Sequence, residues 1–155
     1  MNTHKLIETF YTSFSNGNSK EMADCYHKDI VFQDPVFGTL KGKRACKMWE
    51  MLLAKRTEST QISFDNIKTN ADQGTATWKA EYTYGETNRK VINIVHANFK
   101  FKDGKIIEHI DSFNLWKWTQ QAMGFAGYLF GWTPFLKSKI QKTTHKKLND
   151  FINNK

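Results

Sequence analysis

The sequence predicts an α+β fold, in which helices gather on one face of an antiparallel sheet. Apolar residues recur at helical spacing within the first 56 residues, whereas runs with strand-like alternation fill residues 62–113. No β-α-β alternation and no internal repeat interrupts this order. With 155 residues and 39% hydrophobic side chains, the chain is long and apolar enough to form one domain around one core.

The first segment is expected to form two helices. Residues 3–15 carry an apolar stripe along one side, made of Leu6, Ile7, Phe10 and Phe14. Asn16-Gly17 ends this helix, because glycine readily adopts the left-handed conformation that follows a helix C-terminus. Ser19 can cap a second, short helix over residues 20–26.

A short strand and a third helix follow. Phe32 and Asp34 point to the same face of a strand that begins at Ile30, and Pro35 ends regular pairing there. Residues 37–42 are expected to form a loop. Residues 43–56 then form a helix whose apolar stripe consists of Cys46, Trp49, Leu52 and Leu53.

The remaining strands complete the predicted sheet. Residues 62–68 and 75–84 are joined by a turn at 70–74, and residues 90–113 form a hairpin around Asp103-Gly104, a dipeptide typical of tight turns. In the second arm of the hairpin, one face carries Ile107, His109, Asp111 and Phe113.

His109 and Asp111 are therefore candidate site residues. Burying an imidazole and a carboxylate without partners is unfavourable, so their place on an apolar face indicates a pocket. Their backbones are about 6.6 Å apart along the strand, and the side chains must lean together to form a bond. If they do, Asp111 would orient His109 as a base near neutral pH. The alternative is that both are solvated, or hydrogen-bonded within an ordinary sheet.

Residues 114–155 are expected to form a helical extension packed on the same domain as residues 1–113. Two helices, at about 114–123 and 136–153, flank an aromatic segment that is interrupted by Gly124, Gly127 and Gly131. We expect this segment to fold over the domain as a lid, with Trp116, Trp118 or Phe130 near the mouth of a cavity. The rival interpretation is a membrane-surface anchor, in which the aromatic residues and the lysines meet anionic lipid.

Composition excludes several classes of function. Of the net charge of +8, +5 lies in residues 137–155, so the main domain shows little sign of binding nucleic acid. A membrane partner is not expected either, and no apolar run is long enough to span a bilayer. Cys25 and Cys46 form no CxxC pair, and without a secretion signal they indicate a cytoplasmic setting. No metal site and no cofactor is expected.

Several local motifs resemble the SnoaL-like proteins of the nuclear transport factor 2-like superfamily, over about residues 3–113. These motifs are Asn16-Gly17, the run from Phe32 to Val36, Gly42, and the run from Asp103 to Asp111. The superfamily includes ketosteroid isomerases, polyketide cyclases and epoxide hydrolases. The resemblance implies a cone-shaped, curved antiparallel sheet that encloses a cavity with the N-terminal helices, and a convex face that often forms a dimer.

The resemblance also implies roles for individual residues. Asp34 looks like the general base of the ketosteroid isomerases, and Asp111 looks like the acid–base aspartate of the cyclases. The two oxyanion donors of the isomerases fall on Phe10 and Ala97, which cannot donate a hydrogen bond. The ligand would contact aromatic residues: Phe10, Phe14, Tyr26, Trp49, Trp78, Tyr82, Phe99 and Phe113. The outward face would carry the isoleucines of a homodimer interface: Ile92, Ile94, Ile106 and Ile110.

The leading hypothesis is a homodimer that binds a small apolar organic molecule. Asp34, His109 and Asp111 would carry out acid–base chemistry on it, as in an isomerase or cyclase. The alternatives are a non-catalytic ligand-binding protein and a protein-interaction module of the same fold. The absent oxyanion donors favour the first alternative, and a cavity completely filled by side chains would favour the second.

Overall fold

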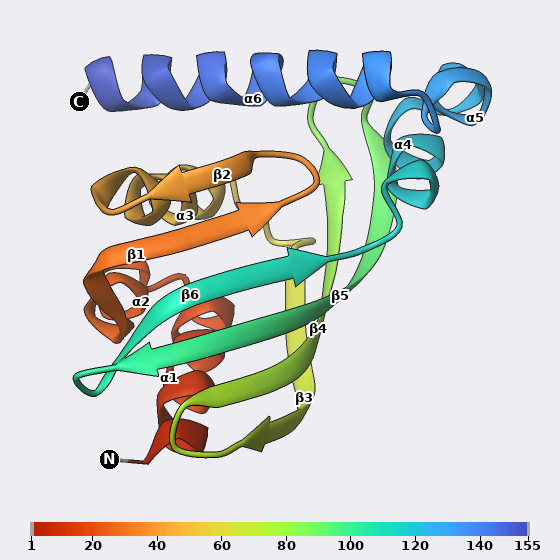
Figure 1. Ribbon diagram of the computed structural model, residues 1–155. Helices are drawn as coiled ribbons and strands as arrows, with labels where there is room; N and C mark the ends of the chain where they lie inside the picture. Colours follow the sequence, from red (N-terminus) through yellow and green to blue (C-terminus); the bar gives the residue numbers. More distant parts are fainter. Residues whose placement is uncertain (1, 155) are drawn as a thin grey trace.

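The computed structural model describes residues 2–154 as a strongly curved, six-stranded sheet with helices inside the curve and across one end (Figure 1). The helices are α1 (Thr3–Ser15), α2 (Ser19–Cys25), α3 (Lys43–Ala54), α4 (Leu115–Met123), α5 (Phe125–Phe130) and α6 (Pro134–Asn153). The strands are β1 (Tyr26–Asp34), β2 (Gly38–Lys41), β3 (Gln61–Thr69), β4 (Gln73–Tyr84), β5 (Arg89–Lys102) and β6 (Lys105–Ser112). The α+β class and the cone-shaped curvature predicted from the sequence are confirmed.

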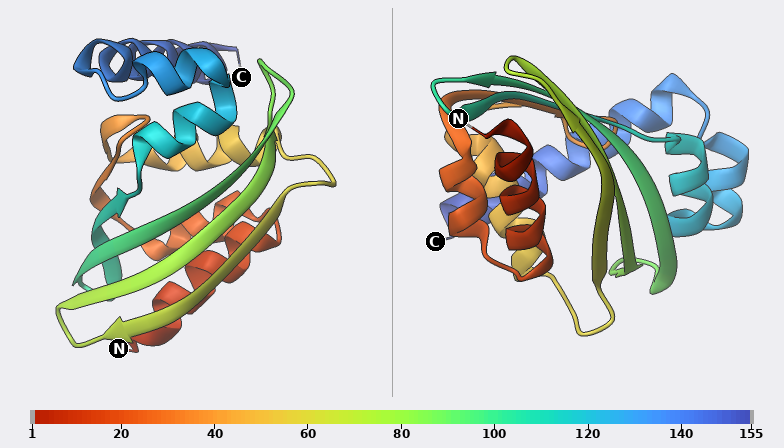
Figure 2. Two further views of the ribbon diagram at one scale, coloured as in Figure 1. Left: turned by 90° about the vertical axis from the view of Figure 1, so that its right-hand side faces the viewer. Right: turned by 90° about the horizontal axis from the view of Figure 1, so that it is seen from below.

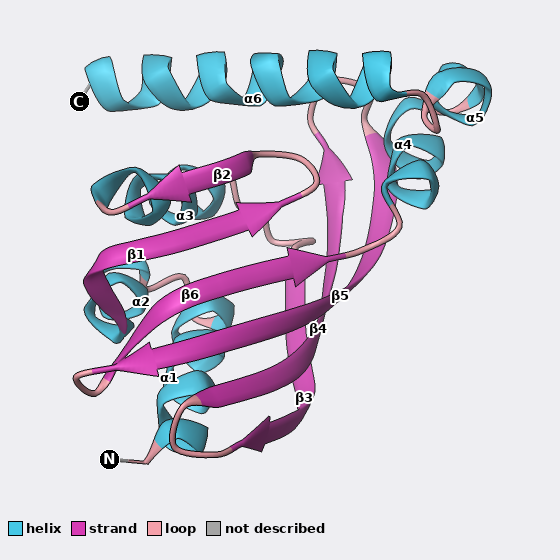
Figure 3. Cartoon of the chain, in the orientation of Figure 1, coloured by secondary structure: helices cyan, strands magenta, loops and turns pink. Residues whose placement is uncertain are grey.

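The sheet has the strand order β2-β1-β6-β5-β4-β3. Neighbouring strands are antiparallel except β1 and β6, which are parallel, so the sheet is mixed rather than wholly antiparallel. The parallel pair arises because β1 and β6 are far apart in sequence and come together only when the β3-β4-β5-β6 meander folds back (Figure 3). This pairing places Phe32 beside His109 and thereby brings the end of β1 to the candidate site.

Helices α1, α2 and α3 lie within the curve of the sheet, as the view from below shows (Figure 2). Their apolar stripes face the concave side, where Ile7, Phe10, Met48 and Trp49 are buried. The first helix has the predicted bounds, and Gly17 follows it with a φ of 75°. Asn18, not Ser19, caps α2, because the side chain of Asn18 accepts a hydrogen bond from the backbone N–H of Glu21.

Two further local predictions were wrong. The predicted loop at 37–42 contains β2, which pairs with β1 through the tight turn after Asp34. Ile106, predicted to face outward, is fully buried. A bulge in β6 causes this, since Lys100 pairs with Glu108 whereas Phe101 pairs with Ile106, leaving Ile107 as an extra residue. The bulge reverses the alternation, so the exposed isoleucines of the outer face are Ile92 and Ile94, with Ile110 partly buried.

The C-terminal segment returns across the wide end of the curved sheet. Helix α4 packs against β5, α5 packs against α4, and α6 runs over α3 and the β1–β2 turn (Figure 1). Side chains of α6 bond this turn: Gln141 donates to the carbonyl of Pro35, and Thr144 donates to that of Val36. No helix within residues 2–154 is both long and apolar enough to cross a membrane.

Candidate functional site

A cavity of about 930 Å³ opens at the wide end of the curved sheet. Its walls come from the concave face of the sheet, from α3, and from the C-terminal helices α4 and α6. The lining is mostly apolar and aromatic, which is typical of sites for small organic molecules. The main aromatic residues on the wall are Phe14, Phe37, Trp49, Trp78, Tyr82, Tyr84, Phe113 and Trp118.

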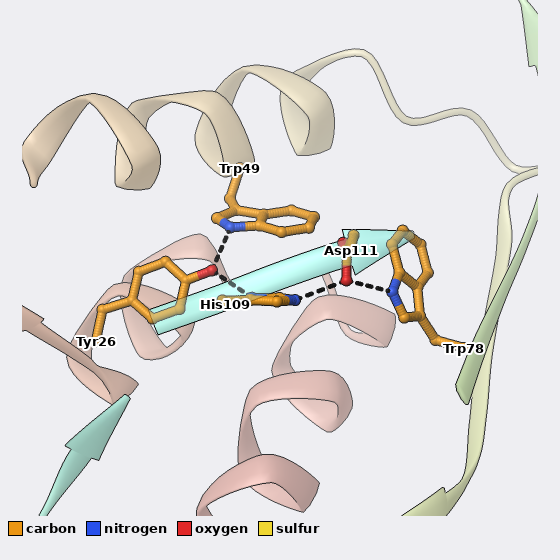
Figure 4. Close-up of polar contacts among 5 residues, drawn as sticks. All are labelled: Tyr26, Trp49, Trp78, His109 and Asp111. Carbon is orange, nitrogen blue, oxygen red and sulfur yellow. Dashed lines mark hydrogen bonds and ion pairs between the residues drawn. The ribbon is translucent and has the colours of Figure 1, made fainter. Parts of the chain in front are cut away.

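Beneath the wall of this cavity, five side chains form one hydrogen-bonded network (Figure 4). The His109 Nε2 atom lies 2.9 Å from Asp111 Oδ1, and its Nδ1 atom lies 2.7 Å from the Tyr26 hydroxyl. Trp49 Nε1 donates to the Tyr26 hydroxyl over 2.9 Å, and Trp78 Nε1 donates to Asp111 Oδ1 over 3.3 Å. The network thus joins β1, α3, β4 and β6.

The donors and acceptors of the network match for only one arrangement of protons. Burial raises the pKa of Tyr26 well above its ordinary value, so this residue remains a phenol with one proton to donate. Within the network the only acceptor available to the Tyr26 hydroxyl proton is His109 Nδ1, so we assign this hydroxyl as the donor to His109 and as the acceptor from Trp49. His109 then carries its proton on Nε2 and donates it to the Asp111 carboxylate.

His109 and Asp111 do not line the cavity. Their exposed fractions are 0% and 3%, and aromatic rings surround His109, with Phe99 at 4.5 Å and Phe32 at 5.1 Å between ring centroids. The ring of Trp49 is stacked on His109, and Trp49 and Trp78 are the network members that line the cavity wall. The two indoles therefore separate the buried pair from the cavity, and the pair holds both indoles in place.

Asp34 does line the cavity. One of its carboxylate oxygens accepts hydrogen bonds from the backbone N–H groups of Val36, at 2.9 Å, and Phe37, at 2.6 Å. Burial, opposed by the backbone bond from Phe37 and supported by the charge of Asp111, raises the pKa of Asp34 to about 7, and the bond from Val36 also acts to lower it. A carboxyl that titrates near neutral pH on an apolar wall is suited to accept and return a proton.

The mouth of the cavity is polar and mainly basic. Lys55, Arg56 and Lys139 lie at the rim, together with Lys147, which is paired with Glu86. On the wall, Trp118 Nε1 donates to the Tyr82 hydroxyl over 2.7 Å, so the C-terminal helix α4 is bonded directly to the sheet. The site thus combines an apolar interior with cations at its entrance.

The structure divides the predicted site residues into two groups. The cavity wall contains Asp34, Phe14, Trp49, Trp78, Tyr82 and Phe113. Beneath it, away from the wall, lie His109, Asp111, Tyr26, Phe10 and Phe99. Of the expected lid residues, Trp118 lines the cavity, whereas Trp116 and Phe130 are exposed elsewhere. No cluster of three metal-binding side chains occurs within residues 2–154.

Sequence reasoning missed the contribution of α6 to the wall. Leu136, Ile140 and Thr144 line the cavity beside Val36. The spacing of Leu136 and Ile140 indicates a helix face but not the element that this face covers.

Comparison with known proteins agrees with this architecture. The family of SnoaL-like domains matches residues 7–109, about two thirds of the chain, and the protein therefore belongs to this family. No curated protein matches the sequence significantly.

Solved structures share the fold at low sequence identity. A ketosteroid isomerase-like protein from Catenulispora acidiphila, in complex with trimethylamine, has a TM-score of 0.67 and 14% identity, over 86% of this chain and 100% of that one. An LEH-like epoxide hydrolase from M. tuberculosis has a TM-score of 0.61 and 17% identity, over 82% and 89% of the two chains. TerC, co-crystallized with polyporic acid, has a TM-score of 0.60 and 15% identity, over 71% and 89%.

Proposed function

We propose that the protein binds a small, largely apolar organic molecule in the cavity and exchanges a proton with it through Asp34. The observation that carries this proposal is the position of Asp34, a carboxyl with a pKa of about 7, on the wall of an apolar cavity of about 930 Å³. The reaction class is proton transfer at a carbon next to a carbonyl group, as in an isomerase or cyclase. The similar structures include proteins described with bound small molecules, which fits a ligand-binding site.

The basic side chains at the cavity entrance indicate which class of ligand the cavity binds. Lys55, Arg56 and Lys139 at the entrance favour a molecule with an acidic or strongly polar group at one end and an apolar body that enters the cavity. Trp49, Trp78 and Phe113 would contact the body. Aromatic keto acids have this combination of properties.

In this proposal, Asp111 and His109 act through the indoles. They hold Trp78 and Trp49 in fixed positions, so that the ligand meets a rigid part of the wall that Asp34 also lines. Direct contact of His109 or Asp111 with a ligand would require one of the indoles to move.

Deuterium exchange tests the proposal on a whole class of candidate substrates at once. A panel of aromatic ketones and keto acids is incubated with the protein in D₂O, and loss of the proton next to the carbonyl is followed by NMR. Binding is followed in parallel by quenching of tryptophan fluorescence, because three indoles line the cavity. We expect Asp34→Asn to bind the active compounds with unchanged affinity and to lose exchange, because an amide cannot accept the proton.

A non-catalytic ligand-binding protein is the second candidate. The side chains of Phe10 and Ala97 are hydrocarbon, so neither offers a hydrogen-bond donor to a developing oxyanion. Binding of panel compounds without exchange in the wild type would favour this candidate. A cavity of about 930 Å³ argues against the third candidate, a protein-interaction module with a filled interior.

We also propose a cytoplasmic homodimer. Cys25 and Cys46 are free thiols, which suits a reducing compartment. The outer sheet face exposes Ile92 and Ile94, which a second copy could cover.

A further inference from the structure

The C-terminal segment exposes an unusual group of apolar side chains. Among residues 2–154, ten large hydrophobic side chains are exposed, and seven of them lie between residues 116 and 135. Six of the seven belong to α5 and the turn into α6, and we name them the α5 patch: Phe125, Tyr128, Leu129, Phe130, Trp132 and Phe135. Figure 2 shows α5 at a corner of the molecule, beyond the edge of the sheet.

Glycines explain why these side chains point outward. Helix α5 contacts α4 through Gly127, where an added Cβ would lie 1.9 Å from the carbonyl oxygen of Thr119. Gly131 makes a second close approach, with an added Cβ 1.9 Å from the Thr119 hydroxyl. Backbone and glycine thus make the contact with the protein, and the large side chains of α5 take little part in it.

The patch is held in a defined shape. Trp116 Nε1 donates to the carbonyl of Tyr128 over 3.0 Å, and the two rings are stacked. Trp132 Nε1 donates to the carbonyl of Leu129, and Thr133 caps α6 immediately afterwards. The exposed rings therefore belong to an ordered element and not to a loose tail.

The surroundings of the patch are basic. Residues 114–149 contain six lysines and no acidic residue. Lys117 on α4 and Lys137 and Lys139 at the start of α6 are exposed on the two helices that flank α5. A cluster of exposed aromatic and aliphatic side chains, carried by a segment whose only charged residues are lysines, is complementary to an anionic, apolar layer.

We propose that the α5 patch binds the surface of a membrane that contains anionic phospholipids. The tryptophan, tyrosine and phenylalanine rings would enter the interface between headgroups and acyl chains, where aromatic side chains are favoured. Lys117, Lys137 and Lys139 would contact the anionic headgroups. The α5 patch residues do not line the cavity, whereas Lys139 also lies at its entrance, so the test below changes the patch and leaves the lysines as they are.

Two other occupants fit the patch less well. In a dimer with two-fold symmetry the patch would meet itself, and the lysines beside it would face the lysines of the second copy. The patch is also not needed as a lid over the cavity, because Trp118, Met123 and Leu136 of the C-terminal segment already line the cavity wall.

Vesicle flotation with the full chain tests the proposal. Vesicles of phosphatidylcholine alone are compared with vesicles that also contain phosphatidylserine. We expect the wild type to float with the anionic vesicles and to be released at high salt, because salt screens the attraction of the lysines to the surface. Its tryptophan fluorescence should shift to the blue on binding, as Trp132 leaves water.

Two variants with several substitutions each distinguish binding through the α5 patch from binding through exposed apolar side chains in general. Phe125→Ser, Phe130→Ser and Trp132→Ser are combined at positions that are 75%, 57% and 69% exposed, so the fold should be retained. We expect this variant to lose at least about tenfold in vesicle affinity, because each ring buried in the interface contributes to partitioning. The matched control is Ile92→Ser with Ile94→Ser, which removes exposed apolar side chains from the sheet; it should still float with the anionic vesicles, although these residues belong to the proposed dimer face.

Further outcomes would overturn the proposal. One is absence of flotation with anionic vesicles, and another is equal flotation of the triple variant and the wild type. A third is a wild-type dimer in sedimentation experiments that the triple variant, but not the isoleucine control, converts to monomer. That result would identify a second copy as the occupant of the patch.

Discussion

Asp34 shows how one residue can meet a structural and a chemical requirement together. Its carboxylate caps the turn after β1 by accepting two backbone N–H groups, and this turn positions β2. Such a role alone is common for an aspartate before proline. The additional feature is its place on an apolar wall, where burial raises the pKa to about 7. The sequence interpretation as a turn and the interpretation as a base are therefore compatible.

The raised pKa of Asp34 predicts a pH dependence of stability. A carboxyl that binds its proton more tightly in the folded state than in the unfolded state favours folding at low pH, and this contribution is lost as pH rises from about 4 to about 7. The amide of an asparagine does not titrate, so Asp34→Asn should gain stability relative to the wild type over this range. We expect a gain in the free energy of unfolding of about 2 kcal/mol at pH 8. One pKa unit corresponds to about 1.4 kcal/mol, and the value for the whole shift is reduced because Asp34 is only partly buried.

Urea denaturation at pH 4, 6 and 8 measures this difference. The control is Asp65→Asn, the same substitution at an exposed position of β3. A constant difference between Asp34→Asn and the wild type across the three pH values would show that Asp34 is not perturbed.

A second residue-scale prediction concerns Asp111. Asparagine at this position keeps an oxygen that can accept from both His109 and Trp78, whereas alanine removes the acceptor. If Asp111 acts only by holding Trp78, Asp111→Asn should retain ligand binding and proton exchange within about threefold, and Asp111→Ala should weaken binding by about tenfold. The two variants are compared by fluorescence quenching and by deuterium exchange. Loss of exchange with unchanged binding in Asp111→Asn would instead make Asp111 the proton carrier.

The site residues could be predicted only in part. Alternation along a single strand placed His109 and Asp111 on one face, and they are bonded there. The same alternation does not show which rings cover that face. Trp49, Trp78 and Tyr26 come from three other elements, and the contact of Tyr26 with His109 depends on the parallel β1–β6 pairing, which links distant parts of the chain.

At the scale of elements, the sequence-based predictions were wrong where a single residue changes the pairing register or the ending of a strand. Ile107 is an extra residue in β6, and it buries Ile106, which simple alternation assigns to the outer face. The strand β2 has only four residues and follows a proline, so its composition resembles a loop. Its formation depends on the Asp34 turn and on Gly38, which has a φ of 71°. Long helices and long strands were predicted well because many residues contribute to each pattern.

Helix α5 provides a prediction at this scale. Gly127→Ala places a methyl group where the Thr119 carbonyl lies, and a backbone atom cannot move away as a flexible side chain can. Because α5 is short and contacts little besides α4, we expect local detachment and not global unfolding. Hydrogen exchange of the amides in residues 125–131 should become at least about tenfold faster, which corresponds to about 1.4 kcal/mol.

Gly85→Ala is the matched control, since a Cβ at this position meets no atom within 4 Å. Equal exchange in the two variants would contradict the packing described for α5.

In the whole molecule, both parts of the chain form the wall of the cavity. Residues 1–113 supply Asp34, Trp49 and Trp78, and the C-terminal segment supplies Trp118 and Ile140. The bond from Trp118 to Tyr82 connects the two parts across the wall. The SnoaL-like domain matches only residues 7–109, so much of this cavity wall is formed by a segment outside the region that defines the family.

The proposed homodimer gives the last prediction. After the correction at Ile106, the outer face retains Ile92, Ile94 and Ile110 as its apolar side chains. In an isologous interface one lysine at Ile94 and one at Ile110 would place four buried charges across the two-fold axis, and unpaired buried charges are strongly unfavourable. We therefore expect Ile94→Lys with Ile110→Lys to be a folded monomer in sedimentation equilibrium under conditions where the wild type is a dimer. The Phe125→Ser, Phe130→Ser and Trp132→Ser variant is the control, and it should remain a dimer, because the α5 patch lies outside this face. A wild-type protein that is monomeric at high concentration would refute the interface. Ile106→Lys cannot serve in this test, because the Ile106 side chain belongs to the core and its replacement would disturb the fold.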